Sequence, residues 1–395
     1  MAGGWSSLPA DLLAQISALL LSDADHLHVH QVCAHWRAST SRPAAYRPWV
    51  VAGRQVPDGR GPLGEYSLLL PRGGRRVDFA ASPPPGLRYC CGTPRGWLAL
   101  VDDLRSPTRL VLWEPHSGAE IPLPCLCPVI QVFLSGDPLS SPDWVAIATQ
   151  PKGPIAHILF FWRPGDAAWS GPGRAPAATV HSIEFYAGKV YCVDSRENIT
   201  IYDLKLGTTS PPVFLQATGM FITQAYREPG ANRRLNCLTH SVRAVHVVAC
   251  GGELLLVLLF DSRRGMFMEV YRPAWTPLWP CRVGERVTDL GGYALFLGRG
   301  DVAALSSKEY PAIKGNCIYY LKHSLNAHSL NAHRDALMKH LAIVEKMKHW
   351  AMVFDLGTDA MEHIPYPEVL HKEERWWPYS WFCPPRPLLE RSSFS

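Results

Sequence analysis

Apolar residues follow two different periods along this chain, and the change of period divides it into two parts. Between Leu12 and Leu20 the leucines and the isoleucine recur every three or four residues, which predicts a helix with one apolar stripe. Beyond about residue 87, short runs of Val, Ile, Leu and aromatic residues alternate with Gly, Pro, Asp and Asn, as in strands joined by tight turns. We therefore predict a small helical module followed by a large all-β domain.

The first part, residues 1–49, is predicted to form three short helices. Leu8-Pro9 opens the first, because proline is tolerated in a first helical turn, and Asp11 complements the positive end of the helix dipole. Ser22-Asp23 is placed to cap a second helix that runs to Val32-Cys33, and a third carries Trp36-Arg37. Three such helices cannot bury all their large apolar side chains among themselves, so the rest of the chain or a partner has to cover the surplus.

The second part contains several predicted hairpins. Val245–Ala249, Glu253–Phe260 and Met266–Tyr271 form a meander, which is most of one four-stranded blade. Further strands are predicted at Gly96–Val101, Arg109–Trp113, Trp144–Thr149, His157–Trp162, Gly188–Asp194, Ile199–Leu204, Tyr293–Leu297, Cys317–Leu321 and Met352–Asp355. Such strands continue for about three hundred residues, more than one sandwich domain usually holds. We therefore predict a β-propeller of four-stranded blades over residues 87–385.

Three other segments differ in composition. Residues 50–86 are rich in Gly, Pro and Arg and are predicted to be a linker with loops and one strand at Tyr66–Leu70, while residues 386–395 form a tail. Within residues 323–350 the pentamer SLNAH occurs twice in tandem, and Asp335 to Trp350 has the spacing of a basic amphipathic helix. We predict a helical insertion on the propeller rim, which either binds a partner or is a packed or mobile excursion.

Charge and cysteine content bear on location and partners. A formal net charge of +5 over 395 residues is too dilute to indicate nucleic-acid binding. The N-terminus lacks a secretory signal, and the apolar stretch Val242–Phe260 is interrupted by charged residues and glycines, so we expect strands there and no membrane span. The 11 cysteines have irregular spacing and are expected to be reduced, which favours the cytoplasm or the nucleus.

Motifs for catalysis, metals or cofactors are absent from the sequence. There is no G-x-S-x-G, H-E-x-x-H or P-loop pattern, and the adjacent Asp102-Asp103 would point to opposite faces of a strand. Cys125-x-Cys127 lacks a second Cys or His pair nearby, and His323, His328 and His333 recur at five residues because the pentamer is duplicated. We expect no enzyme, no metal and no cofactor.

Nine of the 14 tryptophans fall into two groups. Those within predicted strands are expected in the core: Trp97, Trp113, Trp144 and Trp162. Those near prolines are expected in loops, where aromatic residues can anchor a protein ligand: Trp275, Trp279, Trp376, Trp377 and Trp381. The alternative for Trp376–Trp381 is that they close the propeller by packing the chain end on the first blade.

The helical module resembles an F-box, which docks substrate receptors onto the Skp-type linker of a cullin–RING ubiquitin ligase. The resemblance rests on the order Leu8-Pro9, Leu12-Leu13, Ile16, Asp25, Val32-Cys33 and Trp36-Arg37. It implies that the linker, and through it the cullin, is reached by the residues Leu8, Pro9, Leu12, Leu13, Ile16, Val32, Cys33 and Trp36. Many F-boxes carry arginines in the second helix, where this chain has His26, His28 and His30.

The β domain resembles the KIB-type propeller of a plant F-box family. Four stretches carry this likeness, namely Arg95–Pro124, Ile183–Leu204, Val245–Val257 and Val287–Tyr320. The two resemblances together imply a non-catalytic substrate receptor of an SCF-type ligase, with an unidentified target protein held by the propeller. The alternatives are a propeller that binds a small molecule or sugar, with the helices as a cap, and an enzyme with a dispersed site.

Overall fold

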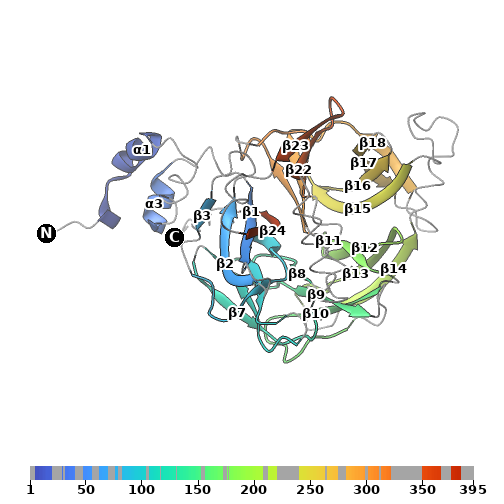
Figure 1. The fold of residues 1–395 in the computed structure, drawn as a ribbon, viewed down its shortest axis with the longest axis horizontal. Helices are drawn as coiled ribbons and strands as arrows, with labels where there is room; N and C mark the ends of the chain where they lie inside the picture. Colours follow the sequence, from blue (N-terminus) through green and yellow to red (C-terminus); the bar gives the residue numbers. More distant parts are fainter. Residues whose placement is uncertain are drawn as a thin grey trace.

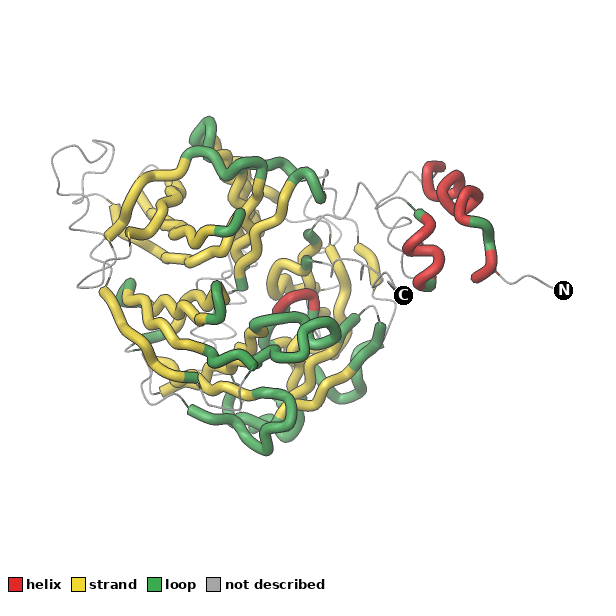
Figure 2. The backbone as a smooth tube through the Cα atoms, turned by 180° about the vertical axis from the view of Figure 1, so that it is seen from behind, coloured by secondary structure: helices red, strands yellow, loops and turns green. Residues whose placement is uncertain are grey.

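A computed structural model describes residues 5–19, 29, 32–40, 48–55, 62–69, 76–78, 82–103, 106–115, 117–129, 131–152, 156–171, 176, 178–207, 212–219, 240–262, 265–274, 282–298, 301–310, 313–321, 349–365 and 375–383. Six β-sheets stand in a ring, and a pair of helices lies beside it (Figures 1 and 2). The ring is a six-bladed β-propeller. The sequence predicted a propeller but not its number of blades.

The helical module begins with the 3-10 turn η1 (Trp5–Ser7), followed by α1 (Ala10–Leu19) and α3 (Ala34–Ser39). Of the predicted second helix only Val29, Val32 and Cys33 are described. Val29 and Val32 have helical conformation, whereas Cys33 is extended and forms the N-cap of α3 instead of the end of the second helix. The remainder of that helix, with His26, His28 and His30, lies outside the described residues, as does most of the predicted insertion at 323–350.

The first three sheets use the N-terminal half of the β domain together with its last strand, β24. One contains β24 (Arg375–Phe382), β1 (Trp49–Gln55), β2 (Pro62–Leu69) and β3 (Arg76–Asp78) in that order. The next contains β4 (Tyr89–Cys90), β5 (Leu98–Val101), β6 (Leu110–Trp113) and β7 (Glu120–Leu123). The third contains β8 (Gln131–Leu134), β9 (Ala146–Lys152) and β10 (Ala156–Trp162).

The other three sheets follow in chain order. The fourth contains β11 (Val180–Tyr186), β12 (Lys189–Asp194), β13 (Asn198–Asp203) and β14 (Val213–Gly219). The fifth contains β15 (His240–Cys250), β16 (Glu253–Ser262), β17 (Gly265–Ala274) and β18 (Arg282–Val287). The sixth contains β20 (Val302–Ser306), β19 (Tyr293–Leu297), β21 (Cys317–Leu321), β22 (His349–Asp355) and β23 (Ala360–Pro365).

The ring is closed by pairing the first strand with the last. β1 runs antiparallel to β24, with Trp49 opposite Phe382 and Val50 opposite Trp381, and red β24 lies beside blue β1 in Figure 1. This corrects two predictions. The segment from Arg375 to Phe382 is a strand and not a loop, and residues 50–86 supply three strands of a blade where we predicted a linker with one.

The number of strands per blade also differs from the prediction of four. The third sheet has three strands among the described residues, and the sixth has five. In the sixth sheet β19 turns back as a hairpin into β20, so the following strand β21 has to pair with the other edge of β19. That return makes β19 and β21 the parallel pair of this sheet.

Each blade is buried on both faces against its neighbours. On β12, Val190 and Cys192 pack in one apolar cluster while Tyr191 and Val193 pack in the next, because successive side chains of a strand point to opposite faces. A strand covered on both sides reads as a continuous apolar run, as β16 does from Leu254 to Phe260. The four tryptophans predicted in the core are all buried: Trp97, Trp113, Trp144 and Trp162.

Candidate functional sites

Helix α1 has two apolar sides. Leu13 and Ser17, four residues apart, are each only 1% exposed and face the interior of the helical module. On another side Leu12 is 43% exposed, Ile16 39% and Leu19 78%. Their spacing of four and three residues puts these three side chains on one surface, which we call the α1 apolar face. An ordinary surface helix would have polar residues there.

Hydrogen bonds hold this module together. The Trp36 indole Nε1 donates to the Trp5 carbonyl oxygen at 2.9 Å, which ties α3 to η1. The His35 Nε2 lies 2.7 Å from the Leu8 carbonyl oxygen, and the Thr40 hydroxyl donates to the Trp36 carbonyl oxygen at 2.9 Å. The start of α1 is therefore fixed against α3, and the α1 apolar face is presented by a held scaffold.

The eight residues predicted to meet the linker differ in accessibility. Pro9, Leu12, Ile16 and Val32 are exposed, Leu8, Cys33 and Trp36 are half-buried, and Leu13 is buried. Leu13 is thus placed in the interior of the module and not on its surface. Two exposed residues were not among the eight, Trp5 and Leu19, each 78% exposed. Leu19 could have been found from its spacing to Ile16, whereas Trp5 precedes the periodic stretch and carried no such signal.

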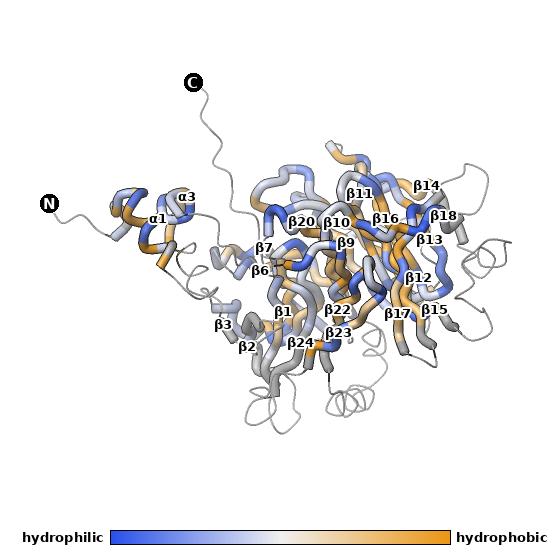
Figure 3. The backbone as a smooth tube through the Cα atoms, turned by 90° about the horizontal axis from the view of Figure 1, so that it is seen from above, coloured by the Kyte–Doolittle hydropathy of each residue, from blue (hydrophilic) through white to orange (hydrophobic). Residues whose placement is uncertain are grey.

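The helices do not cover the ring of sheets. In three views α1 and α3 lie beside the sheets, at the side where β3 is found, and apolar segments of α1 are visible (Figure 3). Trp49, which we predicted as the last residue of the helical module, is the first residue of β1 and is buried in the propeller.

A second site is a cavity of about 700 Å³ on the axis of the propeller. Its walls come from residues near the carboxyl ends of β8, β11, β15 and β24, together with β20 and the 3-10 turn η2 (Pro94–Gly96). The charged residues of its lining are Arg95, Asp137, Glu184 and Asp301, and Phe185 lies beside Glu184 in the chain. Since five blades and the turn after β4 meet here, no local stretch of sequence could reveal this site.

Two of the cavity carboxylates are held by neighbouring donors. Asp137 accepts hydrogen bonds from Trp97 Nε1 at 3.0 Å, from the Leu139 amide at 3.2 Å and from the Ser140 hydroxyl at 3.0 Å. Asp301 accepts from the Thr93 amide at 3.3 Å, and the Thr93 hydroxyl donates to the Trp381 carbonyl oxygen at 3.0 Å. The bonds of Trp97 and Thr93 cross from the second blade to its neighbours and help to fix the cavity wall.

Glu184 is the buried carboxyl group of the cavity. The Phe185 amide donates to its Oε1 at 2.8 Å and the Ala249 amide of β15 donates to its Oε2 at 3.1 Å. Burial raises the pKa of Glu184 to about 7, while the two amides and the Arg95 charge act in the opposite direction. Near neutral pH this group therefore exchanges between its charged and uncharged forms.

Arg95 is the cation of the cavity. Its backbone has a φ of +50°, a left-handed conformation that costs a residue with a Cβ about 1 kcal/mol. The Arg95 Nε donates to the Leu134 carbonyl oxygen at 2.8 Å, and the guanidinium carbon lies 6.0 Å from the centre of the Phe185 ring. The side chain is thereby held in one place although it is exposed to solvent.

An aromatic cluster closes one side of the cavity. Trp381 of β24 is buried, and its Nε1 donates to the Leu297 carbonyl oxygen at 3.0 Å. Its ring meets Phe296 edge to face at a centroid distance of 5.3 Å. The alternative prediction for Trp381, that it closes the propeller, is the one that the structure supports.

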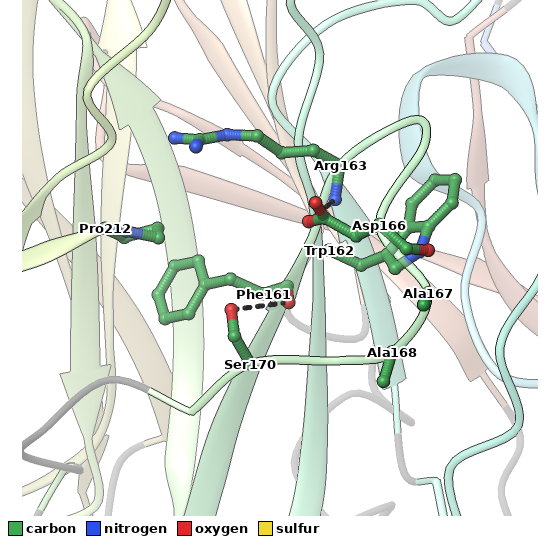
Figure 4. Close-up of a pocket in the computed structure, with 8 residues that line it drawn as sticks. All are labelled: Phe161, Trp162, Arg163, Asp166, Ala167, Ala168, Ser170 and Pro212. Carbon is green, nitrogen blue, oxygen red and sulfur yellow. Dashed lines mark hydrogen bonds between the residues drawn. The ribbon is translucent and has the colours of Figure 1, made fainter. Parts of the chain in front are cut away.

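A smaller pocket of about 240 Å³ lies at the outer end of β10 (Figure 4). The Arg163 amide donates to the Asp166 carboxylate at 3.0 Å, while its guanidinium extends away from Asp166 and donates to the Leu204 carbonyl oxygen. The Ser170 hydroxyl donates to the Phe161 carbonyl oxygen at 3.2 Å. Because these polar groups already make hydrogen bonds to protein atoms, the pocket has less hydrogen-bonding capacity for a ligand than the axial cavity has.

The described residues provide neither a metal-binding cluster nor a membrane-spanning helix. No three His, Cys, Asp or Glu side chains there are grouped so that they could hold a metal ion. The described cysteines are free thiols, and Cys125 and Cys127 are exposed. No described helix has the length and apolar character needed to cross a membrane.

The fold and the axial cavity define the class of this chain as a six-bladed β-propeller protein. The family model of the KIB1-4 β-propeller matches residues 68–357, and the chain therefore belongs to this family. The predicted KIB-type propeller is thus confirmed. No curated protein matches the chain.

Several solved structures match the chain at low similarity. The extracellular domain of the putative one component system BT4673 from B. thetaiotaomicron is 14% identical with a TM-score of 0.29, over 55% of this chain and 25% of that one. BBS1N in complex with ARL6DN is 14% identical with a TM-score of 0.33, over 66% and 72%. Apo AztD from Citrobacter koseri is 11% identical with a TM-score of 0.30, over 67% and 61%. The chain spans a quarter of the length of the first of these, and we carry no property over from any of them.

Proposed function

We propose that this chain is a non-catalytic substrate receptor of an SCF-type ubiquitin ligase. The helical module docks on the Skp-type linker, and the propeller holds a target protein. The observation that carries the proposal is the α1 apolar face, in which Leu12, Ile16 and Leu19 are exposed on a held scaffold. A contiguous apolar surface of this kind on a small module is typical of an interaction site.

The free energy gained by burying these apolar side chains is sufficient for docking. Complete burial of a leucine or isoleucine side chain contributes roughly 1.5–3 kcal/mol. Leu12, Ile16 and Leu19, joined by Trp5 and Val32, are partly or largely exposed, so a partner can still gain much of this free energy. The sum is comparable with the estimated cost of association, which begins at about 4 kcal/mol.

The alternative of a small-molecule propeller with a helical cap is less well supported. A cap would be expected over the ring, whereas α1 and α3 lie beside it (Figure 3). The alternative also leaves the α1 apolar face without a purpose. A third possibility, an enzyme with a dispersed site, has no catalytic motif in the sequence in its favour.

A pull-down tests the proposal. The full chain should retain a Skp-type linker, and a chain that lacks residues 1–47 should not. The deletion stops there because Trp49 is part of β1, so the propeller stays intact. Replacing Leu8 and Pro9 with alanine in the full chain should weaken retention. Equal retention by the full and the shortened chain would overturn the proposed docking.

A further inference from the structure

We propose that the axial cavity binds the carboxylate of an acidic side chain in the target protein, and that Arg95 is the residue that recognises it. The inference rests on the proposed function and adds the chemical class of target that the propeller takes. It is drawn from the distribution of unused hydrogen-bonding groups in the cavity.

Unused donors are concentrated on Arg95. A guanidinium has five N–H groups, and only the one on Nε is bonded, to the Leu134 carbonyl oxygen. The two terminal nitrogens have no hydrogen-bond partner in the part of the chain that the structure describes. Arg95 also forms no ion pair with Asp137, Glu184 or Asp301, although all four residues line the same cavity. Two parallel N–H donors are what a carboxylate accepts in bidentate fashion.

The cavity acids offer less to an incoming group. Asp137 accepts from three donors, Glu184 from two amides and Asp301 from the Thr93 amide. The net charge of the cavity alone would favour a cation. However, the acceptor sites of these carboxylates are partly occupied, whereas both terminal nitrogens of Arg95 are open to an incoming anion.

The backbone of Arg95 supports a recognition role. A non-glycine residue at a φ of +50° carries conformational strain, and such strain often marks a site where a side chain has to be held in a given direction. Glycine would fit this position without strain, as Gly96 does next to it at +83°. The arginine therefore occupies this position at a cost, with its guanidinium carbon 6.0 Å from the centre of the Phe185 ring.

The surrounding acids select a single negative charge. The three carboxylates already outweigh the charge of Arg95, so binding depends on a bidentate contact with its terminal nitrogens, and a phosphate dianion would meet stronger repulsion than a monoanion. Phe185, Phe296 and Trp381 make part of the wall apolar, which strengthens that contact. An Asp or Glu side chain of the target fits these conditions better than a phosphorylated residue does.

The direct test uses peptides and the purified full chain. Pools of capped octapeptides, degenerate except for one central residue, are passed over immobilised protein, with Glu, Gln, Lys or phosphoserine at the fixed position. The Glu pool should be retained about tenfold better than the Gln pool, which corresponds to one bidentate pair. Arg95→Gly should abolish this preference while its backbone becomes less strained, and Arg95→Lys should lose most of it because lysine lacks the fork.

The pH dependence of peptide affinity, which follows the protonation of Glu184, gives a second test. The charged groups that face Glu184 across the cavity are Arg95 of η2, Asp137 after β8 and Asp301 before β20; Tyr310 and Cys383 are the other ionisable wall residues, and β15 contributes the Ala249 amide. A bound carboxylate adds negative charge, so it binds best while Glu184 is protonated. Affinity for a peptide from the Glu pool should fall about tenfold between pH 6 and pH 8. Glu184→Gln should bind with little dependence on pH.

The outcomes separate this inference from the proposed function. Equal retention of the Glu and Gln pools, stronger retention of the Lys pool, or stronger retention of the phosphoserine pool would each overturn the carboxylate assignment. If the full chain still retains the Skp-type linker in those cases, the receptor function stands and only the target class is wrong. A carboxylate preference that survives Arg95→Gly would also contradict the role of Arg95.

Discussion

At the scale of single residues, Arg95 and Glu184 combine unusual states in one cavity. Arg95 has a left-handed backbone and a side chain anchored only through Nε, and Glu184 is a buried acid with no ion pair among the described residues. Neither the backbone conformation of Arg95 nor the burial of Glu184 could be predicted from the sequence. Arg95 follows a proline and precedes a glycine, which reads as an ordinary turn, and Glu184 stands in a strand where its burial depends on β15, more than fifty residues later.

The strain at Arg95 can be measured with a pair of variants. Arg95→Gly and Arg95→Ala both remove the hydrogen bond to Leu134, but only glycine adopts a φ of +50° without cost. The glycine variant should therefore be more stable than the alanine variant by about 1 kcal/mol. Urea denaturation of both proteins measures the difference. A less stable glycine variant would contradict the strained conformation.

Glu184 should make the stability of the protein depend on pH. Its pKa is raised from 4.5 to about 7 in the folded state, so its contribution is fully present below about pH 4.5 and is lost as the pH rises through 7. Between pH 5 and pH 8 the loss should be roughly 2–3 kcal/mol.

The matched variant is Glu184→Gln, which does not titrate. The difference in free energy of unfolding between wild type and this variant, followed by urea denaturation at pH 5, 6, 7 and 8, should shift against the wild type as pH rises. A difference that stays constant over this range would show that Glu184 ionises normally in the folded protein.

At the scale of elements, local and non-local strands differ in how well the sequence predicts them. The meander of β15, β16 and β17 was predicted because Gly251-Gly252 and similar tight turns join strands that are neighbours in the chain. The pairing of β1 with β24 was not predicted, because these two strands lie at opposite ends of the β domain. The prolines beside the tryptophans of β24 also suggested a loop.

The closing strand should make a large contribution to stability through Trp381. Its ring packs on Phe296, and its Nε1 bonds to Leu297 in the adjacent blade. Trp381→Ala should lower the free energy of unfolding by about 3–5 kcal/mol. Trp5→Ala is the control, since Trp5 is 78% exposed and should change propeller stability by less than about 0.5 kcal/mol. Equal effects of the two variants would contradict the closure by β24.

The two sides of α1 should respond differently to a charge. Leu13→Asp buries an unpaired carboxylate inside the module, so hydrogen exchange of the α1 and α3 amides should accelerate strongly. Leu12→Asp places the same charge on the exposed side and should leave exchange nearly unchanged. Similar acceleration in both variants would indicate that α1 has no distinct inner and outer side.

At the scale of the whole molecule, the chain combines a closed ring with a module that stands beside it (Figure 1). The propeller class could be predicted because strands and turns repeat over the length of the β domain. The blade boundaries could not, since the ring closes between residues at its two ends. The residues of the F-box-like segment could be named from their order, but which of them point outward, as Leu12 and Ile16 do and Leu13 does not, depended on the packing of α1 on α3.

The central claim is that the α1 apolar face docks a Skp-type linker, and the most direct measurement is the dissociation constant of that complex by isothermal titration. The double variant Leu12→Asp/Ile16→Asp should weaken binding by about a hundredfold or more, because two apolar contacts are replaced by charges that must be desolvated. Ala14→Asp, a charge at an exposed position on the opposite side of the same helix, should stay within about threefold of the wild type. Wild-type affinity in the double variant, with α1 still folded, would contradict the account.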